Sequence, residues 1–263
     1  MPAINNPIVL AKIQSFLAPT VAVHLHTYAE VGSTNVEAKT FARTSQTNEI
    51  QAFIAEQQSA GYGRSGRKFY SPEGTGIYMS LLLPMARIAD FNVGLFTTGA
   101  AVSVVDALQV SFPKTVFQLK WVNDIYVNRQ KCCGILAEHF MAAGRDYVVL
   151  GIGINVTTAN FPADIARKAG GIQTEGGAVD RNRIVADVLS AFWRMYPTYQ
   201  NGGHLAKYRD LFMLKDCTVR LTVGNDSVVG TALTVADDGG LVIETTDGTI
   251  RTFRSGEVTK VNF

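Results

Sequence analysis

This chain of 263 residues has few cysteines and few prolines, and its net charge is small. Its three cysteines, Cys132, Cys133 and Cys217, cannot form a disulfide framework, and the adjacent pair lacks the spacing of a zinc knuckle. We therefore expect small buried thiols in a reducing compartment, and so a cytoplasmic protein. The formal net charge of +2, from 24 basic and 22 acidic residues, excludes a chain that binds nucleic acid or a membrane through its overall charge. Any basic site must be local.

A targeting segment and a membrane span are also missing from the sequence. The first residues, MPAINNPIVLAK, contain no basic stretch before their apolar run, which Lys12 interrupts. The most apolar stretch, residues 93–110, carries Asp106 and several polar side chains that would be costly in lipid. We predict that this stretch forms a long buried helix of a soluble protein.

Hydrophobic residues make up 47% of the chain, enough for a sizeable core. Up to about residue 214, helix and strand patterns follow each other in irregular order, which favours an α+β fold with a mixed sheet flanked by helices. An Asn6-Pro7 start predicts a helix through about Phe16. Asp180 predicts the cap of a later helix. The strands of this part are expected at about 21–28, 51–55, 76–83, 117–121, 124–127, 133–138 and 147–156.

The last roughly 50 residues have a different pattern, with strand signals and no helix signals. Short β-rich runs at 219–223, 227–235, 241–244 and 249–253 are separated by turns rich in Gly, Asn and Asp. Such closely spaced strands predict a small SH3-like β barrel. We therefore expect a domain of residues 1–214 and a C-terminal domain of residues 215–263.

A glycine-rich basic loop is the strongest chemical signal in the sequence. It reads Gly61-Tyr-Gly-Arg-Ser-Gly-Arg67, and no carboxylate occurs between Gln57 and Pro72. Glycines expose backbone N–H groups, and arginines offer paired donors to phosphate or carboxylate. The loop therefore indicates an anion site, although a flexible basic surface loop would have the same composition. It is neither a Walker A loop nor a dinucleotide-binding fingerprint, because no helix opens after its last glycine.

A second group of charged residues lies on a predicted hairpin. Lys120, Trp121, Asn123 and Asp124 lead into the hairpin, and its far strand opens with Lys131. This arrangement brings cations and a carboxylate together, and Asp124 could orient a lysine, hold Mg²⁺ or assist proton transfer. Solvated residues at strand ends are the alternative interpretation.

Two further short motifs could contact a ligand. Glycines inside the apolar strand 151–155 (Gly-Ile-Gly-Ile-Asn) suit a close backbone approach, or else a bulge. The triplet Ser33-Thr34-Asn35 could hydrogen-bond a neutral polar ligand. The pattern Thr34-x-x-Glu37 also has the form of a capping box, which would account for Thr34 by itself.

Taken in this order, the four motifs resemble the biotin protein ligases. The resemblance runs from about Val21 to the C-terminus and includes the stretch from Ala55 to Arg67, the Lys-Trp-x-Asn-Asp-Ile hairpin and the small β-rich domain. It implies a class II synthetase-like catalytic domain of the biotin–lipoate ligase type. It also implies two reactions: biotin and MgATP form biotinyl-5′-AMP, and a lysine of a biotin carboxyl carrier domain then takes the biotin.

The resemblance also assigns roles to individual residues. For biotin it implies Ser33, Thr34, Asn35, Gln58, Gly61, Tyr62, Gly63, Arg64, Lys131 and Gly134. For ATP it implies Arg64, Arg67, Lys120, Asn123, Gly151, Gly153 and Asn155. The charged groups implied in catalysis are Arg64, Lys120, Asp124 and Lys131. Asp124 is also the candidate ligand for Mg²⁺.

Some expectations rest on differences from the family pattern. Many members have Arg where this chain has Tyr62, so the ordering of the loop is expected to differ. Only 32 residues precede Ser33, too few for an added helix-turn-helix domain, which predicts a monofunctional ligase that binds no operator DNA. A lipoate or octanoate ligase or transferase of the same fold is the main alternative. A nucleic-acid-binding module is a weaker one, and a homodimer through a sheet edge stays open.

Overall fold

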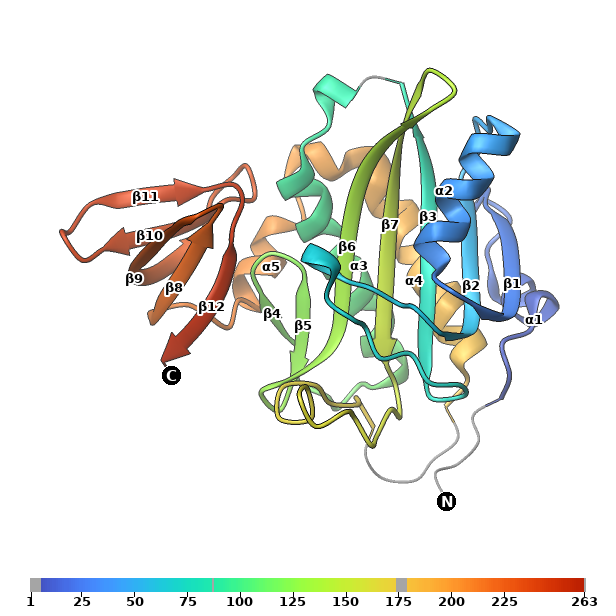
Figure 1. The fold of residues 1–263 in the computed structure, drawn as a ribbon, viewed down its shortest axis with the longest axis horizontal. Coiled ribbons are helices and arrows are strands. Elements are labelled where there is room, and N and C mark those ends of the chain that lie inside the picture. The colour runs from blue at the N-terminus through green and yellow to red at the C-terminus, as the bar shows by residue number, and fades with distance from the viewer. Residues whose placement is uncertain (1–5, 87, 174–178, 263) are drawn as a thin grey trace.

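The structure is a computed structural model that describes residues 6–86, 88–173 and 179–262 (Figure 1). In the first part of the chain the helices are α1 (Leu10–Phe16), α2 (Thr34–Ser45), α3 (Val93–Ser111), α4 (Arg181–Met195) and α5 (Leu205–Asp210), with short 3₁₀ turns at Arg64–Gly66, Ile88–Asp90 and Tyr196–Asn201. The strands there are β1 (His24–Val31), β2 (Gln51–Gln58), β3 (Gly76–Met85), β4 (Gln118–Lys120), β5 (Asp124–Val127), β6 (Gln130–Ala142) and β7 (Arg145–Asn155).

A seven-stranded mixed sheet forms the centre of the molecule. Its order is β1-β2-β3-β7-β6-β5-β4, and only β1 and β2 pair in parallel. On one face α2 packs on alternate side chains such as Phe53, Leu82 and Val149. The larger core on the other face lies under α3 and α4. The part of the first face that α2 leaves uncovered is where the site forms.

The predicted buried helix is confirmed in α3. It is long and apolar enough to cross a membrane, but most of its side chains are buried inside the protein. Asn92 caps it by accepting a hydrogen bond from the N–H of Leu95 at 3.0 Å. The predicted cap at Asp180 is also confirmed, since its side chain accepts from the N–H of Asn182 at 3.0 Å.

The predicted helix start at Asn6-Pro7 is wrong. The helix α1 begins three residues later, after Val9. The carbonyl oxygens of Asn6 and Pro7 instead accept hydrogen bonds from the side chains of Arg181 and Asn182, at 3.0 and 2.9 Å. These long-range bonds hold the segment extended against α4.

The C-terminal part is a five-stranded antiparallel sheet. Its strands are β8 (Cys217–Val223), β9 (Asp226–Val235), β10 (Leu241–Thr245), β11 (Ile250–Phe253) and β12 (Glu257–Asn262), in the order β11-β10-β9-β8-β12. The first four were expected, and β12 was not. Among the described strands the two outer ones do not pair with each other, so the closed SH3-like barrel stays a prediction.

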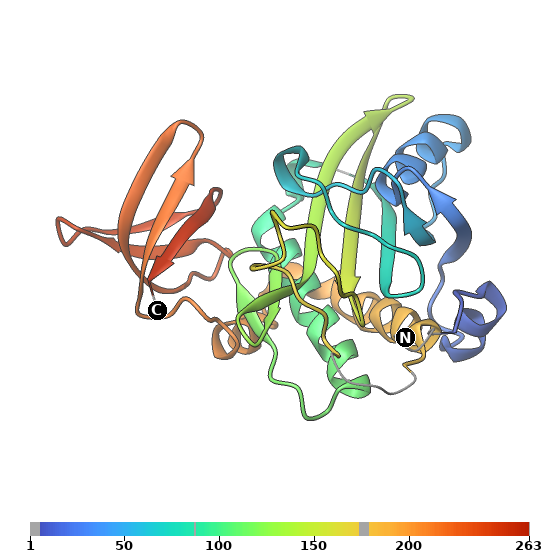
Figure 2. The same ribbon diagram turned by 60° about the horizontal axis from the view of Figure 1, so that its bottom comes forward.

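The two sheets are in contact beside the β4–β5 hairpin (Figures 1 and 2). The indole N–H of Trp121 donates to the carbonyl of Gly239 at 2.9 Å. Gly94 and Gly239 let two backbones meet, because a Cβ added to Gly94 would lie 2.8 Å from the carbonyl oxygen of Asp238. An ion pair between Arg209 and Asp237, 2.6 Å long, lies beside this contact. The contact brings the start of β12 to the edge of the site.

Candidate active site

A cavity of about 800 Å³ lies on the uncovered face of the large sheet. The glycine-rich basic loop Gly61–Arg67, called the Gly-Arg loop below, and the segment 161–169 lie in front of β6 and β7 and help to enclose it (Figure 2). Its lining includes eight Lys or Arg side chains and three carboxylates, whereas the whole chain has a net charge of only +2. The expected local basic site is therefore present and suits an anionic ligand.

The cavity brings together almost all of the residues singled out from the sequence. Those that line it are Ser33, Thr34, Asn35, Gln58, Tyr62, Gly63, Arg64, Arg67, Lys120, Asn123, Asp124, Lys131, Gly134, Gly151, Gly153 and Asn155. Gly61 alone of that set is not part of the lining. A Cβ at Gly61 would lie 2.8 Å from both Gln58 Nε2 and Ser71 Oγ, so this glycine allows close packing behind the loop.

The neutral end of the cavity lies at the start of α2. Thr34 is the first helical residue, and Ser33 precedes it without a side-chain capping bond. The capping box expected at Thr34 is therefore wrong. Instead, Gln58 Oε1 accepts from the Thr34 N–H at 2.8 Å and from the Thr34 hydroxyl at 3.1 Å. A side chain of β2 thus caps the helix and leaves hydroxyl and amide groups facing the cavity.

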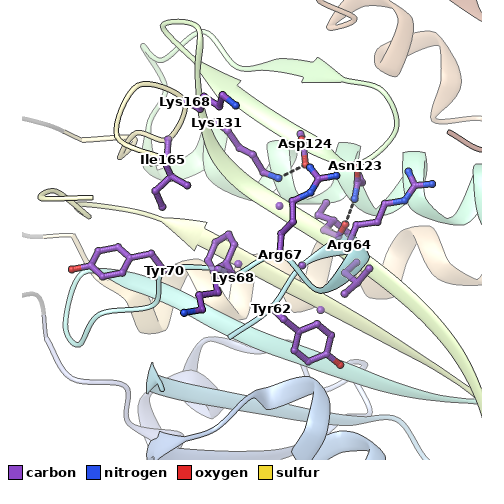
Figure 3. Close-up of a pocket in the computed structure, with 18 of the residues that line it drawn as sticks. Tyr62, Arg64, Arg67, Lys68, Tyr70, Asn123, Asp124, Lys131, Ile165 and Lys168 are labelled. Atoms are coloured by element: carbon purple, nitrogen blue, oxygen red, sulfur yellow. Dashed lines mark hydrogen bonds and ion pairs between the residues drawn. The ribbon is translucent and has the colours of Figure 1, made fainter. Parts of the chain in front are cut away.

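The charged end of the cavity is built around Asp124 on β5 (Figure 3). Lys131 Nζ lies 2.6 Å from Asp124 Oδ1, and the lysine side chain is still one-third exposed (34%) to the cavity. Burial lowers the pKa of Lys120, although the nearby Asp124 carboxylate opposes that shift. A partly desolvated ammonium attracts an incoming phosphate strongly, because water screens it less.

The C-terminal sheet supplies partners for three cations of the cavity. Arg64 donates to the carbonyl of Gly256 at 2.5 Å, and Lys120 donates to the carbonyl of Val258 at 2.9 Å. Arg67 forms an ion pair with Glu257, whose pKa is lowered mainly by that arginine. Three cations expected to meet phosphates are therefore held at the start of β12.

The glycines of β7 make room for side chains of this protein. A Cβ at Gly151 would lie 2.4 Å from Asn35 Oδ1, and one at Gly153 would lie 2.5 Å from Phe69 Cζ. Gly134 on β6 similarly lies under Lys131, whose Nζ would be 3.1 Å from an added Cβ. The assignment of Gly151 and Gly153 to ATP stays a prediction.

Sequence reasoning missed several residues of the site. Glu138 on β6 lies behind the lining and binds Asn35, Lys39 and Tyr62 at 2.9 Å each. The segment 161–169 adds Lys168 to the cavity. Glu138 is a carboxylate within the apolar run of β6, and this unusual position could have identified it from the sequence. Nothing in the sequence links Glu138 to Asn35, Lys39 and Tyr62, which lie 76 to 103 residues away along the chain.

The oxygen donors of the cavity suit a magnesium ion that arrives on phosphates. Among the described residues, no three His, Cys, Asp or Glu side chains gather as a metal-binding group. Magnesium usually needs only one or two protein oxygens when a substrate supplies phosphates. Asp124 pairs with Lys131 through Oδ1, and the buried Asn155 Oδ1 has no hydrogen-bond partner among the residues that the structure describes. Both side chains fit as oxygen donors.

Known proteins resemble this chain in sequence and in fold. Residues 29–155 match the Biotin/lipoate A/B protein ligase family, and residues 217–261 match the Biotin protein ligase C terminal domain. The biotin--[acetyl-CoA-carboxylase] ligase of Mycobacterium tuberculosis is 30% identical over 226 residues, which cover 84% of this chain and 83% of that protein. The chain belongs to the biotin protein ligase family.

A further relative and a solved structure extend the comparison. The bifunctional ligase/repressor BirA of Bacillus spizizenii is 32% identical over 208 residues. The match covers 74% of this chain but only 62% of the length of that relative. The solved structure of the Aquifex aeolicus biotin protein ligase in complex with biotin and ATP superposes with a TM-score of 0.76 and 28% identity. It covers 90% of this chain and 97% of that one. The predicted α+β fold class is confirmed.

Proposed function

We propose that this protein is an ATP-dependent biotin–[acetyl-CoA-carboxylase] ligase. It forms biotinyl-5′-AMP from biotin and ATP and transfers the biotin to a lysine of a biotin carboxyl carrier domain. The observation that carries the proposal is one cavity with a neutral hydrogen-bonding end at Thr34 and Gln58 and a cationic end at Lys120 and Lys131. A long acid with a polar head and a carboxylate fits between these ends.

The cationic end suits the first reaction. An oxygen of the biotin carboxylate attacks the α-phosphorus of ATP, and pyrophosphate leaves. The two reactants are both anions, so fixed cations are needed to bring them together. We assign Lys131 to the carboxylate and Arg64, Arg67 and Lys120 to the phosphates, because all four side chains line the cavity.

A magnesium ion bound with ATP would neutralise part of the phosphate charge, and Asp124 and Asn155 are its candidate ligands. In the second reaction the ε-amine of the carrier lysine attacks the acyl carbon and AMP leaves. The Gly-Arg loop lies over the cavity and would keep water from the reactive anhydride.

Exchange of ³²P between pyrophosphate and ATP tests the proposal. We expect exchange with biotin and none with lipoate or octanoate. Lys131→Met should abolish it, and Lys114→Met, which removes an exposed lysine outside the cavity, should leave it unchanged. Exchange with lipoate alone would favour the second candidate, a lipoate ligase. The match of residues 217–261 to the biotin protein ligase C terminal domain supports biotin over lipoate.

We also propose that the protein works in the cytoplasm, because its three cysteines are free thiols. Recovery of the native protein in the membrane or extracellular fraction of its source cells would contradict this location.

A further inference from the structure

A network of four side chains joins the Gly-Arg loop to the large sheet and to α2. Glu138 on β6 accepts hydrogen bonds from Asn35 Nδ2, from Lys39 Nζ and from the Tyr62 hydroxyl, each at 2.9 Å. Lys39 on α2 also donates to the Tyr62 hydroxyl at 3.2 Å and lies over the tyrosine ring, 5.8 Å from its centre. We call Asn35, Lys39, Tyr62 and Glu138 the Glu138 network.

Glu138 and Lys39 are both charged in this network. Burial alone would raise the pKa of the Glu138 carboxyl, but the bonds from Lys39, Asn35 and Tyr62 outweigh burial and lower it. Similar bonds raise the pKa of Lys39 against the effect of burial. The Tyr62 hydroxyl is therefore bound to both members of an ion pair whose side chains are only 19% and 26% exposed. Hydrogen bonds to charged groups are stronger than those between neutral groups, so this attachment of the loop is a firm one.

The far end of the loop is attached to the C-terminal sheet instead. Residues 64–67 are exposed, and among the described residues the other loop side chains that bond outside the loop are Arg64 and Arg67. Their partners are the Gly256 carbonyl and the Glu257 carboxylate. In the part of the chain that the structure describes, Tyr62 therefore makes the only side-chain hydrogen bonds between the loop and the large sheet or α2.

The two attachments respond differently to a phosphate ligand. Arg64 and Arg67 are assigned to the phosphates, so they must give up their partners at the start of β12 when ATP binds. Figure 3 shows Arg67 pointing toward Asp124 and the Tyr62 ring pointing away from it. Lys39 and Glu138 do not line the cavity, and neither is assigned to a substrate. The attachment at Tyr62 is therefore the one that stays in place while the arginines change partners.

We propose that Tyr62 is a positioning residue, bound to Lys39 and Glu138 so that it holds the Gly-Arg loop over the cavity before any ligand binds and while the arginines change partners. The inference rests on the proposed function, because the molecule that the loop retains is the acyl adenylate formed there. An adenylate that escapes reacts without selectivity. Water or any lysine amine attacks its acyl carbon and loses a proton, the bond from the acyl carbon to the phosphate oxygen breaks, and AMP leaves. The Glu138 network thus reserves the biotin for the carrier lysine.

Limited trypsin digestion of the ligand-free protein tests the position of the loop. Trypsin cuts after Lys and Arg, and the exposed Arg64, Arg67 and Lys68 offer three sites whose fragments mass spectrometry identifies. We expect Tyr62→Phe to be cut there about tenfold faster than the wild type, because cleavage follows the population of the open loop. Biotin and ATP together should slow the cutting of the wild-type loop by no more than about twofold, because the loop is already closed without them.

Two further variants separate this role from a general loss of structure. Tyr28→Phe is the matched control, since it removes the hydroxyl of another half-buried tyrosine, on β1 and outside the cavity, and the cutting rate should not change. Lys39→Met removes the cation of the network without touching the cavity lining and should also speed cutting. The double variant of Tyr62 and Lys39 should be cut no faster than the faster single variant, because both changes open the same attachment.

Escape of the adenylate is measured as steady AMP formation from biotin and ATP without a carrier domain. We expect Tyr62→Phe and Lys39→Met to form AMP at least about fivefold faster than the wild type, while the pyrophosphate exchange rate of Lys39→Met stays within about twofold. A merely structural defect would lower the melting temperature and expose trypsin sites outside the loop instead.

The outcomes separate the inference from the function on which it rests. Equal cutting of the loop in the wild type and in both variants would refute the role of Tyr62. Faster cutting with unchanged AMP formation would refute the retention of the adenylate. Absence of biotin-dependent exchange in the wild-type protein would overturn the proposed function, whereas digestion of the ligand-free protein would still decide whether Tyr62 holds the loop.

Discussion

Replacing Arg181 by Met should destabilise the protein severely. Arg181 on α4 is 0% exposed, forms an ion pair with Glu56 on β2 and donates to the carbonyls of Gly76 and Asn6, both at 3.0 Å. The variant would leave the Glu56 carboxylate without its cation and two carbonyls without donors. Among the residues that the structure describes, only the N–H of Ile8, at 2.9 Å, would still bond the carboxylate.

The size of the effect follows from this burial. Removing one partner of a buried ion pair costs about 3–5 kcal/mol. For a chain of this length, each kcal/mol lowers the melting temperature by about 2–4 °C, so the expected fall is about 6–20 °C. Melting followed by circular dichroism or calorimetry measures it.

Two comparisons give this prediction its controls. Arg183→Met, two residues along α4, breaks an exposed pair with Asp187 and should lower the melting temperature by less than about 2 °C. The double variant Arg181→Met with Glu56→Gln should recover part of the loss, because no uncompensated charge remains. A fall of less than 3 °C for Arg181→Met, or a double variant that is no more stable, would refute the reasoning.

Three more predictions concern the site. Gly153→Ala should displace the Phe69 ring, which would lie 2.5 Å from the new Cβ, and raise the KM for ATP or biotin about fivefold or more in the exchange assay. Unchanged KM values would contradict the close packing. Asp124→Asn should free Lys131 and lower kcat at least about tenfold, with a higher Mg²⁺ requirement in a magnesium titration; a full-rate variant would remove Asp124 from the mechanism. The pKa of Glu138 is below its ordinary value of 4.5, so the ionised network stabilises the fold fully above pH 4.5 and less as the pH falls below it. The difference in melting temperature between wild type and Glu138→Gln should therefore shrink below pH 4.5, and a difference independent of pH would argue against an ionised Glu138.

Local sequence signals located most of the elements before residue 214, and all but one of the site residues singled out from the sequence line the cavity. The strand Asp124–Val127 lies where the pattern placed it, and Asp180 caps its helix as expected. These features depend on neighbours within a few residues, such as alternation in a strand or a side chain that bonds the first helical turn. The Gly-Arg loop could likewise be identified from its composition, because the glycines and arginines are contiguous.

Contacts between distant segments account for what the sequence could not predict. Thr34 looked like a helix cap, but Gln58, 24 residues away, bonds its N–H and hydroxyl. Glu138 meets Asn35 from 103 residues away. The strand β12 pairs with β8 and delivers Glu257 to Arg67 across 190 residues. No local pattern encodes such partners, since each depends on how the sheets pack.

The reactivity of the two adjacent thiols of β6 would report whether the strand that carries Lys131 stays paired in the sheet. Cys132 and Cys133 are 0% exposed, and burial raises the pKa of Cys132 to about 12 and that of Cys133 well above its usual value. Only a thiolate reacts quickly with alkylating reagents, so both sulfurs are inert while the strand stays paired. Cys217 is partly exposed and stands as an internal reference. The ratio of labelling rates between the pair and Cys217 would therefore measure how often the centre of the sheet opens in the native protein, without an engineered cysteine.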